Sequence, residues 1–207
     1  MVGDMALDII GIPRSNFVRA VCMVAREKGV EYNLTPAMPH SDEVKVIHPM
    51  GQIPVMRHDG LELAESQAIA RYIDDGFDGL PMIPRDPRAA ASVNQWVSLT
   101  ASSVDQLLMR RYVVEYAFHK DGDGNVVRSE IDKAIKRFPR MFAMLETAVA
   151  PGFLGSGSFS MADCFLVPIL AAARNFSEGE AALAGSSVLT AYFKKIAARP
   201  SFVETAT

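Results

Sequence analysis

Two adjacent residues in the first half of the chain have the types and placement to bind a small charged molecule. Glu65 and Ser66 follow an alternating stretch over residues 61–64 and precede a helical pattern in which Ile69 and Ile73 share a face. The free N–H groups and dipole of a first helical turn favour an anion, and Ser66 adds a hydroxyl donor. The carboxylate of Glu65 beside that anion site suits a zwitterion with both an ammonium group and a carboxylate.

A second candidate is Ser15, which stands where an apolar run over residues 7–11 gives way to a helical stripe. Either Ser15 or Asn16 can cap that helix. A hydroxyl donor at a helix N-terminus stabilises a nearby anion, because the helix dipole acts in the same sense.

The elements around these residues have a consistent order. The helix that begins near Ser15 ends at Gly29, a favoured residue just past a helix end. The other elements are a strand over residues 7–11, a strand over 31–34, a short helix over 41–47, a strand begun by Pro54, a tight turn at Asp59 and Gly60, a strand over 61–64 and the helix after Ser66. The order βαβαββα predicts a thioredoxin-like α/β domain over residues 1–77.

Residues 48–73 carry a resemblance to a known family. The order Gly-Gln-Ile-Pro, strand, Asp-Gly, strand, Glu-Ser and helix resembles the glutathione-binding half of cytosolic glutathione S-transferases, most of all the serine-type classes (phi-, tau- or theta-like) of plants and bacteria. The resemblance implies that Pro54 is cis and that the backbone of Ile53 binds the cysteinyl part of glutathione. It also implies that Glu65 and Ser66 bind the γ-glutamyl end.

The family's chemistry needs a thiolate at neutral pH, and the resemblance makes Ser15 the catalytic donor to it. A free thiol has a pKa of about 8.5, and one hydrogen bond to the charged form lowers that pKa by about one to two units. The spacing from Ser15 to Glu27 and Lys28 matches the serine classes, and no tyrosine or cysteine occupies this turn. Asn16, Arg14 or a backbone amide are alternative donors, and an ordinary helix cap is the alternative role of Ser15.

The resemblance extends to both substrates. Gln52 matches a position that bonds the glutathione backbone, and His40, with a one-residue gap, lies near a histidine that meets the glycyl carboxylate. The alternative for His40 is a solvated loop residue. The second substrate is expected to be an apolar electrophile held between the domains, and the candidates to line its pocket are Ile12, Pro13, Arg14, Val104, Leu108 and Tyr112. The last three would also suit the core of any helical bundle.

A change in composition divides the chain. Residues 76–87 contain two glycines and three prolines, so we predict a linker over residues 78–87 and an all-helical domain over residues 88–207. Pro139 is expected to bend or split one of its helices. Ser160 and Asp163 have capping-box spacing at the start of another.

Composition and charge exclude several classes of protein. A net charge of −3 with mixed signs gives no basic surface for nucleic acid. No apolar run reaches membrane-span length, and the N-terminus lacks a secretory pattern. Cys22 and Cys164 stand in apolar stretches and the four histidines do not cluster, so we expect buried thiols and no metal. The sequence predicts a soluble, cytoplasmic protein.

Three functions are consistent with these observations. The first is a detoxifying glutathione transferase, with glutathione as co-substrate, that conjugates an electrophile or reduces a hydroperoxide. The alternative is a non-catalytic binding or scaffold protein on the same fold. A thiol–disulfide oxidoreductase is disfavoured because no cysteine lies near Ser15. The resemblance further implies a homodimer, for which Met56 and the exposed side of the helix after Ser66 are candidate contacts.

Overall fold

The computed structural model describes residues 6–205, which form two compact units. The first unit contains the chain up to Arg85 together with the segment from Ala198 onward, and the second contains Asp86–Ala197. Residues 1–5 and 206–207, which fall inside the two predicted domains, lie outside the described residues. Within the described part of the chain, no helix combines the length and apolar character needed to cross a bilayer.

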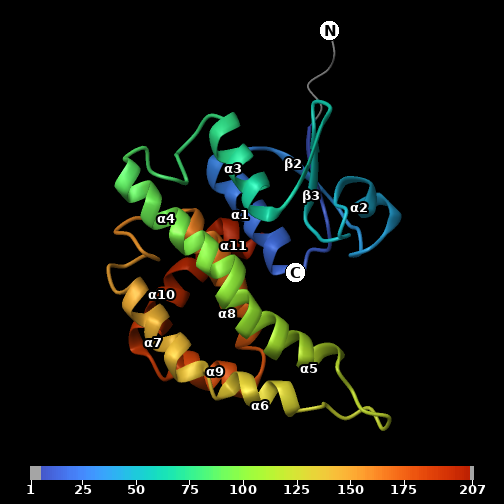
Figure 1. The fold of residues 1–207 in the computed structure, drawn as a ribbon. Helices are drawn as coiled ribbons and strands as arrows, with labels where there is room; N and C mark the ends of the chain where they lie inside the picture. Colours follow the sequence, from blue (N-terminus) through green and yellow to red (C-terminus); the bar gives the residue numbers. More distant parts are fainter. Residues whose placement is uncertain (1–5, 206–207) are drawn as a thin grey trace. The chain divides into compact units, whose positions relative to one another are not determined.

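A four-stranded sheet in the order β2-β1-β3-β4 forms the centre of the first unit. The two strands β1 and β2 are parallel, whereas β3 pairs antiparallel with both β1 and β4. The parallel pair needs a crossover, which helix α1 supplies. The elements are β1 (Leu7–Ile10), α1 (Asn16–Lys28), β2 (Tyr32–Thr35), α2 (Asp42–Ile47), β3 (Val55–His58), β4 (Leu61–Ala64) and α3 (Ser66–Gly76). The predicted thioredoxin-like order is confirmed (Figure 1).

Different helices cover the two faces of this sheet. Alternate residues of a strand point to opposite faces, and Ile10 and Val55 point to the face where Val44 of α2 packs. Helices α1 and α3 pack together on the other side (Figure 1). The paired residues Ile9 and Met56 point to that side, and both are fully buried. The prediction that Met56 is a dimer contact is therefore wrong.

Local signals in the sequence account for the ends of these elements. Ser15 is the N-cap of α1, and Gly29 ends the helix with a left-handed φ of 72°. In the β3–β4 hairpin, Asp59 and Gly60 have φ angles of 47° and 79°. Two consecutive positive φ angles are what a tight two-residue hairpin requires, because their twist matches that of the strands.

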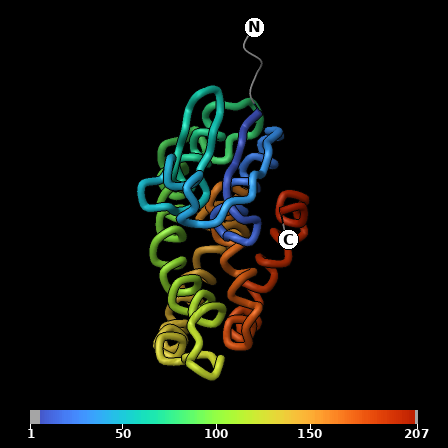
Figure 2. The backbone as a smooth tube through the Cα atoms, turned by 90° about the vertical axis from the view of Figure 1, so that its right-hand side faces the viewer, coloured from blue at the N-terminus to red at the C-terminus, as the bar shows by residue number. Residues whose placement is uncertain are grey.

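The last described residues return to helix α1. Helix α11 (Pro200–Val203) packs against α1, as Figures 1 and 2 both show. The carboxylate of Glu27 accepts two hydrogen bonds from the Arg199 guanidinium, at 2.8 and 2.6 Å, and one from the Ser201 hydroxyl. This bidentate ion pair helps to hold residues 198–205 in the first unit, whereas the sequence pattern assigned them to the helical domain.

A buried ion pair fixes the segment that leaves the first unit. Lys28 Nζ lies 3.4 Å from Asp74 Oδ1, and each side chain is only 3% exposed. The Asp74 carboxylate also accepts hydrogen bonds from the backbone N–H groups of Met82 (2.7 Å) and Ile83 (2.9 Å). Asp74 therefore joins α1, α3 and the following linker through one carboxylate.

The second unit is built from helices, and two of its loops contain isolated β-bridges. Its elements are α4 (Pro87–Leu99), the π-helix η1 (Thr100–Val113), α5 (Val114–Phe118), α6 (Ser129–Ile135), α7 (Phe138–Val149), α8 (Met161–Ala173), α9 (Ser177–Ala184) and α10 (Ser187–Ala197). The chain breaks between α6 and α7, just before Pro139, as expected. Helix α8 is buried along most of its length and begins with the predicted capping box at Ser160 and Asp163. Helices α9 and α11 were not predicted.

The helix that starts at Pro87 continues through η1 and α5 to Phe118 without a break. Its middle part, η1, has the wider turn of a π-helix, in which hydrogen bonds join residues five apart. Asp105 and Arg110 follow this geometry, because their side chains, five residues apart, pair at 3.0 Å.

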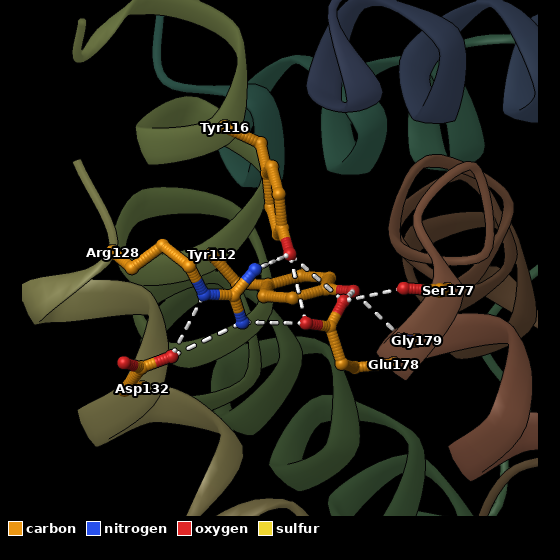
Figure 3. Close-up of polar contacts among 7 residues, drawn as sticks. All are labelled: Tyr112, Tyr116, Arg128, Asp132, Ser177, Glu178 and Gly179. Carbon is orange, nitrogen blue, oxygen red and sulfur yellow. Dashed lines mark hydrogen bonds and ion pairs between the residues drawn. The ribbon is translucent and has the colours of Figure 1, made fainter. Parts of the chain in front are cut away.

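A polar cluster around Glu178 links several helices of the second unit (Figure 3). The Glu178 carboxylate accepts hydrogen bonds from the Tyr116 hydroxyl (2.8 Å), Arg128 Nη2 (2.6 Å) and the Tyr112 hydroxyl (3.2 Å). Partial burial raises the pKa of Glu178, but the hydrogen bonds from Arg128 and Tyr116 outweigh it and lower the pKa to about 2. The cluster joins η1, α5 and α9 with the residue before α6, so we interpret it as structural.

We predict that Asp74→Asn destabilises the protein by about 3 kcal/mol, because it leaves the Lys28 ammonium buried without its counter-charge. Asp75→Asn is the matched control, since Asp75 is exposed and pairs with the exposed Arg71 one turn away. Its cost should stay below about 0.5 kcal/mol. Urea unfolding measures both, and equal midpoints for the two variants would show that Asp74 has no special role.

The Glu178 cluster predicts a pH-dependent contribution to stability. A carboxylate whose pKa is lower in the folded state stabilises the fold above its unfolded pKa of about 4.3, and this contribution is lost as the pH falls towards about 2. Glu178→Gln should therefore cost about 2 kcal/mol at pH 7 and progressively less between pH 5 and pH 2. The control Glu180→Gln removes an exposed partner of Arg174. An unfolding profile of Glu178→Gln that runs parallel to wild type across this range would contradict the assignment.

Candidate functional site

One row of paired residues across the sheet brings the predicted site residues to the same end of the first unit. Thr35 pairs with Ile10, Ile10 with Val55, and Val55 with Ala64. The loop after Ile10 leads to Ser15, the segment before Val55 is Gln52-Ile53-Pro54, and the residues after Ala64 are Glu65 and Ser66. Three segments far apart in sequence therefore meet because of strand register.

Ser15 presents a hydroxyl at the start of α1. Its extended backbone ends the preceding loop, and its Oγ accepts a hydrogen bond from the Val18 N–H at 3.5 Å, the long limit of such a bond. Within residues 6–205, no acceptor takes the hydroxyl proton of Ser15. The side chain is half-buried, whereas Asn16 is buried and Arg14 is exposed. Ser15 thus has an available donor beside the positive end of the helix dipole.

The segment before β3 is held close to the first loop. The Ile53–Pro54 peptide bond is cis, as the resemblance implied. Gly11, after β1, lies so close to this segment that an added Cβ would stand 3.2 Å from Ile53 Cβ and 2.6 Å from Val18 Cγ2. Only glycine fits there without displacement, so Gly11 allows the two segments to approach.

Glu65 occupies an unusual backbone conformation at the start of α3. It is the N-cap of the helix, with φ 71° and ψ 115°, and its side chain is 69% exposed. Glu65 Oε1 lies 3.3 Å from His48 Nε2, and the buried His48 accepts the Met50 N–H at Nδ1 (3.1 Å). An imidazole that accepts at Nδ1 carries its proton on Nε2, which is the His48 nitrogen nearest the Glu65 carboxylate. Ser66 is buried as the first residue of α3.

The sequence pattern did not indicate the contact between His48 and Glu65. The residues lie in different segments, and no local pattern links them. The same loop brings His40 next to Gly51, the residue before Gln52. The His40 N–H donates to the Gly51 carbonyl at 2.7 Å, and a Cβ on Gly51 would lie 2.6 Å from His40 Nδ1. Both His40 and Gln52 are exposed.

The residues predicted to line an electrophile pocket divide between the two units. Ile12 and Pro13 are half-buried and Arg14 is exposed, in the loop between β1 and α1. Val104, Leu108 and Tyr112 lie on η1 with fully buried side chains. The Tyr112 hydroxyl donates to Glu178 and accepts the Gly179 N–H at 2.8 Å, inside the helical unit. The electrophile-binding role of these residues stays a prediction.

The cysteines do not offer a reactive thiol. Cys22 and Cys164 are both buried and reduced. Burial raises the pKa of the Cys22 thiol to about 11, against a smaller lowering by Tyr32 and Arg26. Among the described residues, no group of three or more His, Cys, Asp or Glu side chains is arranged to hold a metal ion. The groups that this site presents to a ligand are therefore hydrogen-bond donors and acceptors and the N-terminal dipoles of α1 and α3.

Comparison with known proteins relates both units to one enzyme family. Residues 9–81 match the family description "Glutathione S-transferase, N-terminal domain", and residues 128–195 match "Glutathione S-transferase, C-terminal domain". The "Glutathione S-transferase 3" of Zea mays is 26% identical over 217 residues, covering 96% of this chain and 92% of that protein. The "Stringent starvation protein A homolog" of Haemophilus ducreyi is 26% identical over 189 residues, covering 89% of this chain and 82% of that protein.

Similarity to solved structures covers both units as well. The crystal structure of glutathione transferase F7 from Populus trichocarpa has a TM-score of 0.86 to this chain and covers 97% of both chains. The sequence identity is 21%, so this similarity establishes the fold and leaves the chemistry to the site residues.

The backbone of Glu65 leads to a stability prediction. A non-glycine residue that adopts the φ and ψ of Glu65 lowers the free energy of unfolding by about 1–3 kcal/mol. Glycine at that position lowers it by about 0.5–1 kcal/mol, because it loses more chain entropy on folding. Glu65→Gly should therefore be more stable than Glu65→Ala by about 1 kcal/mol, although both lose the contact with His48. Urea unfolding of the two variants measures this difference. A less stable Glu65→Gly would show that the conformation is not strained.

Proposed function

We propose that this chain, which belongs to the glutathione S-transferase family, binds glutathione, stabilises its thiolate and transfers the sulfur to a hydrophobic electrophile. Reduction of organic hydroperoxides is included in the proposal, because it needs the same thiolate. The observation that carries it is the row of paired residues that brings Ser15, the Ile53–Pro54 segment and the Glu65–Ser66 junction to one end of the sheet.

The parts of glutathione have matching groups at this end of the sheet. The γ-glutamyl end has an ammonium and a carboxylate: the exposed Glu65 carboxylate suits the ammonium, and the N-terminus of α3 with Ser66 suits the carboxylate. The contact with His48 helps to position the Glu65 carboxylate. The backbone at Ile53 suits the cysteinyl unit, and Gln52 and His40 suit the rest of the tripeptide.

The thiolate is the centre of the proposed mechanism. A hydrogen bond from Ser15 Oγ to the sulfur favours the charged form, and the N-terminal dipole of α1 acts in the same direction. In conjugation, the thiolate forms a carbon–sulfur bond while the electrophile's leaving group departs with its electron pair. Asn16, Arg14 and a backbone amide remain alternative donors, which parallel variants can test.

A second candidate function is a binding or scaffold role without catalysis. The relative named as a stringent starvation protein A homolog supports keeping it, because proteins similar to this chain are not all named as transferases. The two functions are distinguished by glutathione itself. Retention on immobilised glutathione and turnover of an aryl halide support the transferase, and the absence of both supports the scaffold.

A homodimer and a cytoplasmic location complete the proposal. Both follow from family membership, and the exposed side of α3 remains a candidate contact. Small-angle scattering at micromolar concentration should give the mass of two chains, and the mass of one chain would contradict the dimer.

We predict that Ser15→Ala raises the pKa of the bound glutathione thiol by about one to two units, because it removes one hydrogen bond to the thiolate. At neutral pH or below, kcat/KM with an aryl halide should fall about ten- to a hundredfold, and the pH–rate profile should shift to higher pH. The ultraviolet absorbance of the thiolate, followed against pH in the binary complex, measures the pKa directly.

Ser41→Ala is the matched control, because Ser41 is also a helix N-cap and makes no side-chain capping bond. It should leave the thiol pKa unchanged. The variants Asn16→Ala and Arg14→Ala identify the donor if Ser15→Ala has the wild-type pKa, a result that would remove Ser15 from catalysis.

A further inference from the structure

His48 connects two segments that the proposed function assigns to different parts of glutathione. One is the segment Gln52–Pro54, which follows the turn that His48 begins, and the other is Glu65 at the start of α3. The Glu65 carboxylate does not cap its own helix. Among the described residues, no side chain besides His48 makes a hydrogen bond or an ion pair with it. The position of this carboxylate therefore depends on His48.

The His48 side chain is itself held in place from several sides. It is only 7% exposed, and its backbone N–H donates to the Val44 carbonyl (2.8 Å) at the end of α2. The His48 carbonyl accepts the Gly51 N–H at 2.7 Å, and the ring Nδ1 accepts the Met50 N–H at 3.1 Å. A rotated ring would lose this last bond, so the direction of Nε2 is fixed.

The contact at Nε2 restricts a side chain that would otherwise be mobile. Glu65 is 69% exposed, and its Oε1 lies 3.3 Å from His48 Nε2. A glutamate that loses its rotamer freedom only when a ligand arrives reduces the affinity for that ligand. The contact with a fixed imidazole limits this freedom in advance. A carboxylate has about four acceptor positions, so the contact leaves room for an ammonium group.

We propose that His48 is a positioning residue for glutathione binding, with a separate task for each ring nitrogen. Nδ1 holds the turn that leads to Gln52–Pro54, and Nε2 holds the Glu65 carboxylate where it meets the γ-glutamyl ammonium. This assignment rests on the proposed function, because it places glutathione at this end of the sheet. It extends that function by making His48 responsible for the preference for a ligand that carries the ammonium group.

Two substitutions separate the tasks of the two nitrogens. In His48→Asn the side-chain oxygen can replace Nδ1 as the acceptor of the Met50 N–H, but the side chain is too short to reach Glu65. In His48→Gln the amide can place an N–H near the position of Nε2, whereas the Met50 N–H loses its acceptor. A role in the turn alone is therefore kept by His48→Asn, and the positioning of Glu65 is kept by His48→Gln.

Isothermal titration calorimetry of the full chain with two ligands tests the proposal. One ligand is glutathione and the other is glutaryl-cysteinylglycine, the same tripeptide without the ammonium group. Wild type should bind glutathione about tenfold more tightly than the analogue, because one charged hydrogen bond is lost. His48→Asn should weaken glutathione binding by about the same factor and leave binding of the analogue unchanged. His48→Gln should keep the preference for glutathione.

His58→Asn is the matched control. His58 is the last residue of β3, at the opposite end of that strand from Pro54, and its Nδ1 contacts the Tyr72 hydroxyl at 2.7 Å. This substitution also removes a largely buried imidazole from the first unit, so it should leave both affinities unchanged.

The outcomes distinguish the role of His48 from the proposed function. Equal weakening of both ligands by His48→Asn, wild-type glutathione affinity in that variant, or loss of the preference in His48→Gln would overturn the positioning role and leave the proposed function intact. A wild-type chain that binds neither ligand would overturn the proposed function, and the role of His48 with it.

If His48→Asn does not fold, judged by its melting curve, nuclear magnetic resonance of the wild-type chain decides. The ring N–H resonance of His48 Nε2 should shift when glutathione binds and stay near its ligand-free position when the analogue binds. Only glutathione places an ammonium group against the carboxylate that this N–H contacts. Equal shifts with the two ligands would contradict the proposal.

Discussion

The register of the central sheet is the constraint on which the proposed site depends. Ile10, Val55 and Ala64 stand side by side in three strands, so the loops that follow or precede them must meet. A slip of one residue would turn the buried residues of a strand to the opposite face, which the core does not permit. The buried apolar pairs Ile9–Met56 and Ile10–Val55 therefore help to position the polar groups of the site.

The charged and polar groups of the structural clusters have protein partners, whereas some of those at the candidate binding site do not. The Lys28–Asp74 pair is buried and fully used, since its carboxylate also accepts two backbone N–H groups. Glu178 is likewise surrounded by donors. Ser15 differs, because it keeps a donor that no described residue accepts, and Glu65 offers an exposed carboxylate. We therefore assign the fully bonded clusters to stability.

Much of the fold could be predicted because its signals are local. Ser15 and Gly29 delimit α1, Asp59 and Gly60 form the hairpin turn, and Ser160 with Asp163 starts α8. Each of these depends on neighbouring residues alone. Helix α9 was overlooked although Glu178 and Glu180 in its first turn are a usable signal. The π-helical geometry of η1 has no such signal, because the same residues suit an ordinary α-helix.

The site was only partly predictable, because some of its contacts join distant segments. The order of Gln52, Pro54 and Glu65 carries the family resemblance. The register of β3 and β4 then shows how these residues reach the same end of the sheet. The contact of His48 with Glu65, the partners of Asp74 and the return of Arg199 to Glu27 depend on three-dimensional packing. No spacing in the sequence indicates them.

A crystal structure of the complex with glutathione would show whether the thiol lies at Ser15. We expect the sulfur within hydrogen-bond distance of Ser15 Oγ, the cysteinyl backbone paired with Ile53, and the γ-glutamyl end at Glu65 and Ser66. A tripeptide bound elsewhere, or bound with its sulfur away from the N-terminus of α1, would contradict this expectation.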